Sequence, residues 1–109
     1  MILALCFVAH LVGDFLLQNH WMQRKSVSSF VCTVHIAFYS TVFWLILSWP
    51  LVLAILLEHW LQDRFGLHLR WMKFYGQTPP DKWPVGPLCM DQSLHLAFIA
   101  FVVVMGGAS

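Results

Sequence analysis

The sequence predicts an all-α fold, an integral membrane four-helix bundle formed by a single domain of residues 1–109. Three observations predict it. The chain is 60% hydrophobic, and only 10% of its residues are charged, whereas soluble domains have about 25%. The apolar residues gather in four stretches, each about as long as a bilayer's hydrocarbon core is thick. The net charge of +1 and the absence of a basic block exclude nucleic-acid binding as the main role.

The four predicted transmembrane helices cover residues 1–18, 30–49, 50–66 and 88–105. Ser28 can cap the start of the second helix, and Pro50 suits the first turn of the third. Gly66 and the pair Gly106 and Gly107 are typical of helix ends. The segment between the third and fourth helices is rich in proline and tryptophan, and we expect it to lie irregularly along the lipid headgroups.

All the basic residues fall on one side of this predicted topology. They are Arg24, Lys25, Arg64, Arg70, Lys73 and Lys82. Because cytoplasmic loops carry the excess of lysine and arginine in membrane proteins, this side is predicted to face the cytoplasm. Both termini would then lie on the opposite side of the membrane.

Three of the four apolar stretches carry a histidine and an aspartate four residues apart: His10 and Asp14, His59 and Asp63, and Asp91 and His95. Residues four apart project from one helix face, and His35 adds a fourth imidazole. Counted from the basic-side helix ends at about 1.5 Å per residue, all seven side chains lie roughly 4 to 12 Å inside the membrane. Ionisable groups at this depth are costly and usually functional.

These four imidazoles and three carboxylates predict a metal site. They exceed what one tetrahedral zinc ion requires and suit two divalent ions about 3.5 to 4 Å apart, bridged by a carboxylate or water. Mixed nitrogen and oxygen ligands favour zinc, manganese or iron over calcium. The alternative is a set of hydrogen-bonded polar clamps between helices, but three such pairs at one depth favour the metal site.

Four further polar residues flank the predicted ligands and are expected to orient them or the substrate. They are Gln18, Glu58, Gln62 and Gln92. Glu58 adjoins His59 and so points about 100° away from it on a helix, which favours an orienting or helix-contact role over direct ligation. His20 and His68 lie near the basic-side helix ends, where an interfacial role is expected.

The chemistry that such a site predicts is hydrolysis, because metal-bound water becomes acidic enough to supply hydroxide near neutral pH. One of Asp14, Asp63 and Asp91 would act as the general base. A site just below the cytosolic headgroups is well placed to meet phosphoesters or amides of a lipid or lipid-linked headgroup. Lys25 and the nearby arginines can attract an anionic headgroup, although the positive-inside bias explains them equally well.

The ordered set His10-x-x-x-Asp14-Phe15-x-x-Gln18, Lys25, His35, His59-x-x-x-Asp63 and Asp91-Gln92-x-x-His95 resembles the bacterial and phage family called domain of unknown function 3307. The likeness covers nearly the whole chain and implies a small multi-helix protein of the bacterial inner membrane; in such a membrane the charge distribution described above predicts periplasmic termini. A looser likeness is to membrane-embedded metal-dependent hydrolases of the ceramidase-like group. The chain lacks their Ser-x-x-x-His element, so this likeness implies a reaction class without a substrate.

Two other functions compete with hydrolysis. Titratable groups inside a bundle can relay protons or pass metal ions, but a transport pathway should spread polar groups across the membrane, and these are confined to one half. A non-enzymatic phage membrane effector with a structural metal cluster would suit the small size of the chain. A homo-oligomer could also line a pore with faces that a monomer exposes to lipid.

Overall fold

The computed structural model describes residues 1–107, and within them it contains helices, turns and no strand, which confirms the predicted all-α fold. In chain order the elements are α1 (Ile2–Leu11), the π-helical turn η1 (Val12–Leu16), the 3-10 helix η2 (Trp21–Ser26), α2 (Ser29–Tyr39), α3 (Phe43–Ile46), α4 (Trp49–Phe65), α5 (Leu67–Tyr75) and α6 (Gly86–Met105). The first predicted helix is therefore α1 with η1, and the third and fourth correspond to α4 and α6.

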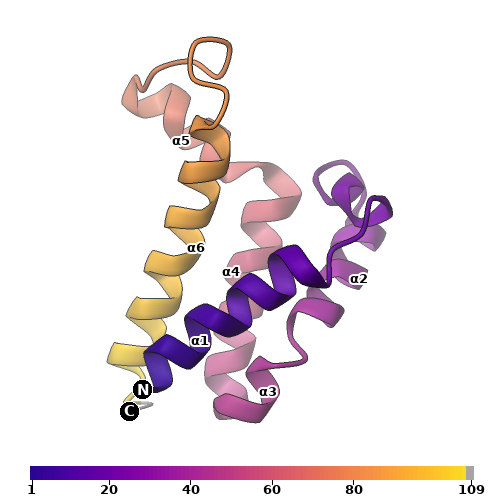
Figure 1. Cartoon of the computed structure of the whole chain (residues 1–109), viewed down its shortest axis with the longest axis vertical. Helices are drawn as coiled ribbons and strands as arrows, with labels where there is room; N and C mark the ends of the chain where they lie inside the picture. Colours follow the sequence, from indigo (N-terminus) through magenta and orange to yellow (C-terminus); the bar gives the residue numbers. More distant parts are fainter. Residues whose placement is uncertain (108–109) are drawn as a thin grey trace.

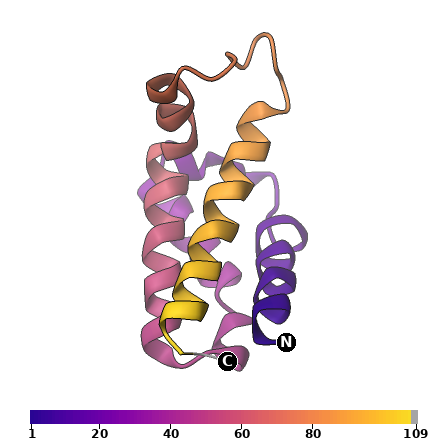
Figure 2. The same cartoon turned by 90° about the vertical axis from the view of Figure 1, so that its left-hand side faces the viewer.

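The helices α4 and α6 run along the long axis of the molecule, and α1 starts beside the lower end of α6 and crosses in front of α4 (Figure 1). Both chain ends lie at one end of the bundle, whereas α5 and the loop after it lie at the other (Figure 2). The basic residues belong to η2, the end of α4, α5 and the following loop. They therefore lie away from the end of the bundle that holds the termini.

The predicted helix ends are confirmed. The Ser28 hydroxyl accepts a hydrogen bond from the backbone N–H of Val31 at 3.3 Å and caps α2. Pro50 occupies the first turn of α4, where a missing N–H costs nothing. Gly66 ends α4 in the left-handed conformation, with φ +57°, which favours glycine because it has no Cβ.

The second predicted helix, residues 30–49, is interrupted. α2 ends at Tyr39 and the short α3 begins only at Phe43. In the interval, Ser40 Oγ donates to the backbone oxygen of Ala37 and Thr41 Oγ1 donates to that of Phe38, both at 2.8 Å. Hydroxyl groups that bond to nearby carbonyls bend helices or offer the backbone an alternative to them, and this explains the break.

The segment after Gly66 also differs from the expectation of an irregular loop. Residues 67–75 form α5, which a second left-handed glycine, Gly76, ends at φ +76°. The prolines that argued against a helix begin only at Pro79. The irregular part is thus limited to the stretch between Gly76 and the start of α6.

A close contact between the first and second predicted helices depends on Gly13. A Cβ atom at this position would lie 2.5 Å from Tyr39 Cδ2 and 3.0 Å from Tyr39 Cα. Glycine therefore lets η1 pack directly on α2. The apolar core lies on the side of the termini and includes Cys6, Ala9, Phe43, Val52, Ile55 and Ile99.

Two helical segments of the described chain are long and apolar enough to cross a bilayer: residues 29–46, which comprise α2 and α3, and α6 with its 20 residues. The segment Ile2–Leu16 is apolar but shorter, and α4 has 17 residues. Large apolar side chains also cover much of the outside, for example Leu45 at 87% and Leu16 at 78% exposure.

Candidate metal centre

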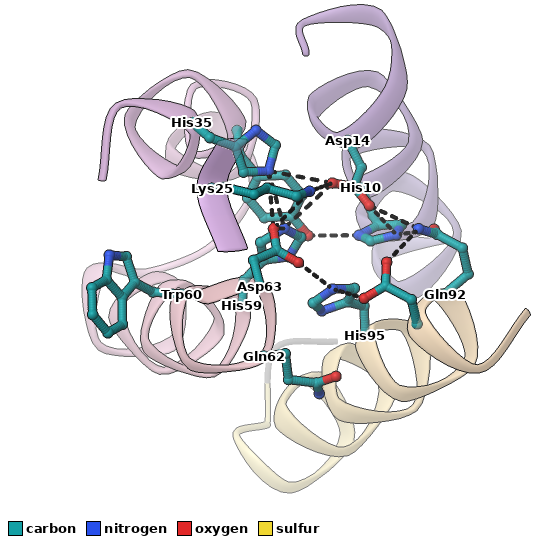
Figure 3. Close-up of polar contacts among 12 residues, drawn as sticks. His10, Asp14, Lys25, His35, His59, Trp60, Gln62, Asp63, Gln92 and His95 are labelled. Atoms are coloured by element: carbon teal, nitrogen blue, oxygen red, sulfur yellow. Dashed lines mark hydrogen bonds and ion pairs between the residues drawn. The ribbon is translucent and has the colours of Figure 1, made fainter. Parts of the chain in front are cut away.

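The seven predicted site residues meet in one buried cluster, to which four helical regions contribute. The histidines His10, His35, His59 and His95 have no exposed surface, and Asp14 and Asp63 are 4% exposed. Figure 3 shows their side chains pointing toward a common centre, whereas Trp60 points away from it. Asp91 lies at the edge of the cluster, with 15% of its side chain exposed.

His35, His59, Asp14 and Asp63 form the first group of possible metal ligands, with one donor atom from each lying within 4.8 Å of the other three. The Nε2 atoms of His35 and His59 are 3.3 Å apart. Asp14 Oδ1 lies 3.3 and 3.4 Å from these two nitrogens, and Asp63 Oδ2 lies 3.2 and 2.9 Å from them. Ligands of a tetrahedral zinc ion lie about 3.3 to 3.5 Å apart, because each is about 2.0 to 2.2 Å from the metal.

A second group of possible ligands consists of Asp14, Asp91 and His95, with one donor atom from each within 4.8 Å of the other two. His95 Nε2 lies 3.2 Å from Asp63 Oδ1 and 3.2 Å from Asp91 Oδ1. The carboxylate of Asp63 thus faces the first group with Oδ2 and the second group with Oδ1. This is the arrangement of a carboxylate that bridges two cations.

Unsatisfied polar atoms mark the centre of the first group. Asp14 Oδ1 is buried and accepts no well-aligned hydrogen bond, and Asp63 Oδ2 accepts none beyond its ion pair with Lys25 Nζ at 2.9 Å. Two imidazole Nε2 atoms that face each other at 3.3 Å cannot both carry a proton without repulsion, whereas two lone pairs can share a cation. Since buried polar groups are normally satisfied, a metal ion fits the residues present.

Lys25 is a member of the cluster that the sequence placed only at its mouth. Its Nζ atom lies 2.9 Å from Asp63 Oδ2 and 3.6 Å from Asp14 Oδ1. Burial by itself would lower the pKa of Lys25, but the carboxylates of Asp63 and Asp14 outweigh it and hold the pKa above its ordinary value. The ammonium group is therefore charged at neutral pH.

Lys25 does not neutralise the cluster. Four of the five acidic residues of the chain lie here: Asp14, Glu58, Asp63 and Asp91. With neutral histidines, these four carboxylates and one ammonium carry a formal charge of −3. One divalent ion brings the charge to −1 and two bring it to +1. Because uncompensated buried charge is very costly, the cluster favours added cations.

His10 does not fit its predicted role as a metal ligand. Its Nε2 atom lies 2.6 Å from Gln92 Oε1, and its Nδ1 lies 2.7 Å from the Tyr39 hydroxyl. The Gln92 amide nitrogen donates to Asp14 Oδ2 at 2.8 Å, so Gln92 Oε1 must accept from His10 Nε2–H. His10 Nδ1 then accepts from Tyr39, and neither nitrogen is left for a metal.

The predicted orienting residues divide into three cases. Gln92 joins the two groups, since its amide also donates to Asp91 Oδ2 at 3.2 Å. Glu58 Oε1 lies 3.3 Å from His95 Nδ1, the nitrogen that faces away from the cluster, and Gln62 donates to Glu58 rather than to a ligand. Gln18 makes no hydrogen bond to the cluster, and its buried Oε1 has no partner among the described residues.

Sequence reasoning missed Tyr39 and His68. Tyr39 is fully buried and lies four residues after His35, so helical spacing places it on the same face. His68 on α5 has its Nδ1 atom 3.5 Å from Asp91 Oδ1, although no spacing connects α5 with α6. The side chains of Lys25, Asp91 and His68 are 15–19% exposed, and so the cluster reaches the surface between η2, α5 and the start of α6.

Comparison with curated proteins and with solved structures finds no match. The family model described as "Protein of unknown function (DUF3307)" matches residues 2–108, nearly the whole chain and every residue of the cluster. The chain therefore belongs to the DUF3307 family.

Proposed function

We propose that the chain is a membrane-embedded, metal-dependent hydrolase that acts on a lipid or lipid-linked headgroup at the cytosolic leaflet. The observation that carries the proposal is the first ligand group. Its two imidazole nitrogens lie 3.3 Å from each other and 2.9–3.4 Å from the two carboxylate oxygens, close to the spacing of donors around tetrahedral zinc.

Two ions suit the cluster better than one. The first group offers four protein donors and closes a tetrahedral site, as structural zinc sites do. The second group, Asp14, Asp91 and His95, offers three donors and leaves a position open, as catalytic sites do. The formal charge of −3 favours added divalent ions, and it is left at −1 by one ion and at +1 by two. Zinc, manganese and iron all accept this mixture of nitrogen and oxygen ligands.

The open position is the proposed place of reaction. A bound divalent ion would supply a water molecule that loses its proton near neutral pH and a positive charge for the oxygen of the scissile bond. Asp91, the most exposed of the three aspartates, is placed to accept a proton as general base. The Lys25 ammonium at the mouth would stabilise negative charge that develops on the substrate.

The membrane setting of this proposal rests on the outside of the molecule. Two segments are long enough to span a bilayer, and exposed leucines and phenylalanines surround the bundle, as lipid contact requires. The cluster opens toward the end that carries the basic residues. By the positive-inside rule this end faces the cytoplasm, which supports a multi-pass bacterial inner-membrane protein with periplasmic termini.

Transport is less well supported. A path for protons or ions would have to continue from the cluster toward the termini, where the buried residues are Cys6, Phe43, Val52, Ile55 and Ile99. Among the described residues of this core, only Tyr39 carries a hydroxyl group, and that group is bonded to His10 of the cluster. The cluster therefore opens on one side only, as a hydrolytic site does.

The test is elemental analysis of detergent-purified protein, with His35→Ala and His59→Ala beside His20→Ala, whose histidine is exposed and outside the cluster. We expect about two zinc, manganese or iron atoms per wild-type chain, a sharp fall in the first two variants and no change in the third. The metal-loaded protein should then hydrolyse a member of a panel of lipid phosphoesters and amides. The proposal would be contradicted if the wild-type protein contained no stoichiometric metal, even after supplementation with metal.

A further inference from the structure

An apolar groove of about 340 Å³ lies between α4 and α6, on the outside of the bundle. It is lined by Ala54, Leu57, Leu61 and Phe98, with Glu58 and Gln62 beside them. A second hollow of about 420 Å³ adjoins it at α5, shares Gln62 and Leu67, and adds Arg70, Trp71 and Phe74. Together these two form what we call the α4–α6 groove, which has the size of a small-molecule site.

The α5 end of the groove is cationic. Arg70 also lines a neighbouring pocket of about 500 Å³ together with Arg64, and no carboxylate lines that pocket or the hollow at α5. Arg64 donates one N–H group to Ser29 Oγ and one to the backbone oxygen of Ser26. Arg70 donates one N–H group to the backbone oxygen of Phe65. Since a guanidinium has five N–H donors, both arginines keep donors for an anion.

The rest of the groove suits a hydrocarbon chain. Leu57 is 63% exposed, Leu61 38% and Phe74 84%, so a chain lying along α4 would cover apolar surface that is otherwise open. The carboxylate of Glu58 is turned toward Gln62 and His95 and closes the groove toward the metal centre. A long apolar run with two arginines at one end matches an amphiphile with an anionic head.

We propose that the α4–α6 groove binds one membrane lipid with an anionic phosphate headgroup, its acyl chain along α4 and its phosphate at Arg70 and Arg64. Arg64 directly follows Asp63 of the metal centre, and Ser26 in the same pocket directly follows Lys25. The pocket of these arginines is lined by residues of η2 and α5, the elements between which the cluster reaches the surface, so the headgroup would lie on that side of the molecule. This inference deepens the proposed function. It rests on that function only where it takes the bound lipid to be the class of substrate.

The test is native mass spectrometry of the detergent-purified chain titrated with phosphatidylglycerol or with phosphatidylcholine of the same acyl chains. We expect one bound phosphatidylglycerol, held roughly tenfold or more tightly than phosphatidylcholine, because the arginines make charge-assisted bonds to the anionic head. Arg70→Gln should remove this preference. Lys73→Gln, which removes the same charge from the same helix outside the groove, should keep it.

The groove itself is tested with Leu57→Trp, which fills it, beside Leu53→Trp one helical turn earlier, where an exposed leucine lies outside it. Only the first variant should lose the lipid. The proposal is overturned if both lipids bind alike, if Leu57→Trp binds as wild type does, or if inorganic phosphate alone displaces the lipid. It is also overturned if Leu57→Trp changes the number of chains per particle, because the groove would then join copies of the chain.

The same samples separate this inference from the proposed function. The metal content of Arg70→Gln and Leu57→Trp should equal that of wild type, since neither residue belongs to the cluster. Lipid selectivity without metal would contradict the hydrolase and leave the lipid site standing. Bound metal without lipid selectivity would contradict the lipid site and leave the proposed hydrolase standing.

Discussion

At the scale of single residues, the hydrogen bonds of the cluster fix where its protons lie. The chain of contacts from Tyr39 through His10 to Gln92 ends on the carboxylates of Asp14 and Asp91. Each hydrogen bond in this chain has one donor and one acceptor. Because Gln92 donates to both carboxylates, residues that are not metal ligands set the orientation of the carboxylates. Such outer partners commonly tune metal affinity by 10- to 100-fold.

Tyr39→Phe tests this chain of contacts. It keeps the aromatic ring but leaves the buried His10 Nδ1 without its donor, and we expect a loss of about 1 to 3 kcal/mol in the free energy of unfolding. Tyr75→Phe is the control, because Tyr75 is 62% exposed. Denaturant unfolding of the metal-free proteins in detergent measures the difference, and equal stability of the two variants would refute the assigned proton positions.

Lys25→Met tests the competition between the ammonium group and the metal. Removing a positive charge that lies 2.9 Å from Asp63 makes the cluster more negative, and so divalent ions should bind more tightly, by roughly tenfold or more. Hydrolysis should fall, since the cation at the mouth is lost. Competition with a chelating dye measures affinity, and Lys73→Met serves as the control. Unchanged or weaker metal binding would contradict the charge argument.

At the scale of elements, the contact of η1 with α2 positions Asp14 against His35. Gly13→Ala would place a methyl group against Tyr39 and push the two elements apart. Overpacking of this kind typically costs about 1 to 3 kcal/mol, and the metal content should fall with it. Leu11→Ala, at an exposed position in the same segment, should leave the metal content unchanged. Full metal loading of Gly13→Ala would show that this contact does not position the ligand.

The helical spacing in the sequence predicted most of the cluster, because residues four apart on a helix must share a face. Asp14, His59, Asp63, Asp91 and His95 were found in this way, and His35 was added because it lies at the same predicted depth in an apolar stretch. Lys25 was not placed against the aspartates, because η2 is a short irregular turn whose direction follows from no periodic pattern. Spacing brought His10 into the cluster but does not show which nitrogens are already bonded, and both nitrogens of His10 are.

Other features of the fold depend on local interactions that a hydropathy pattern does not contain. The break after Tyr39 follows from two hydroxyl groups that bond to carbonyls of their own helix. The helix α5 is bounded by Gly66 and Gly76 in left-handed conformations, while tryptophans and prolines nearby favoured the expectation of a loop. The apolar content of the sequence therefore predicted that the chain is helical, but it did not predict where the helices break.

At the scale of the whole molecule, the cysteines can test the proposed orientation. Cys6 and Cys32 are buried and Cys89 is exposed at the basic-side end of α6. A membrane-impermeant thiol reagent should therefore label Cys89 in inverted membrane vesicles and leave it unlabelled in intact cells. Ser48→Cys in a Cys89→Ser background should show the opposite pattern, because exposed Ser48 lies in the turn before α4. The reverse result for both would mean that the chain is inserted the other way round.

The two ligand groups share Asp14, yet they differ in their access to solvent: the Asp63 side chain of the first group is 1% exposed and the Asp91 side chain of the second is 15% exposed. Two ions held in this way would not be equivalent. The enclosed position should load first and release its ion slowly, whereas the outer position should exchange quickly with the surrounding solution. Mild chelation would then yield a half-loaded protein that remains folded but inactive, and whose activity returns within the time of mixing when metal is restored.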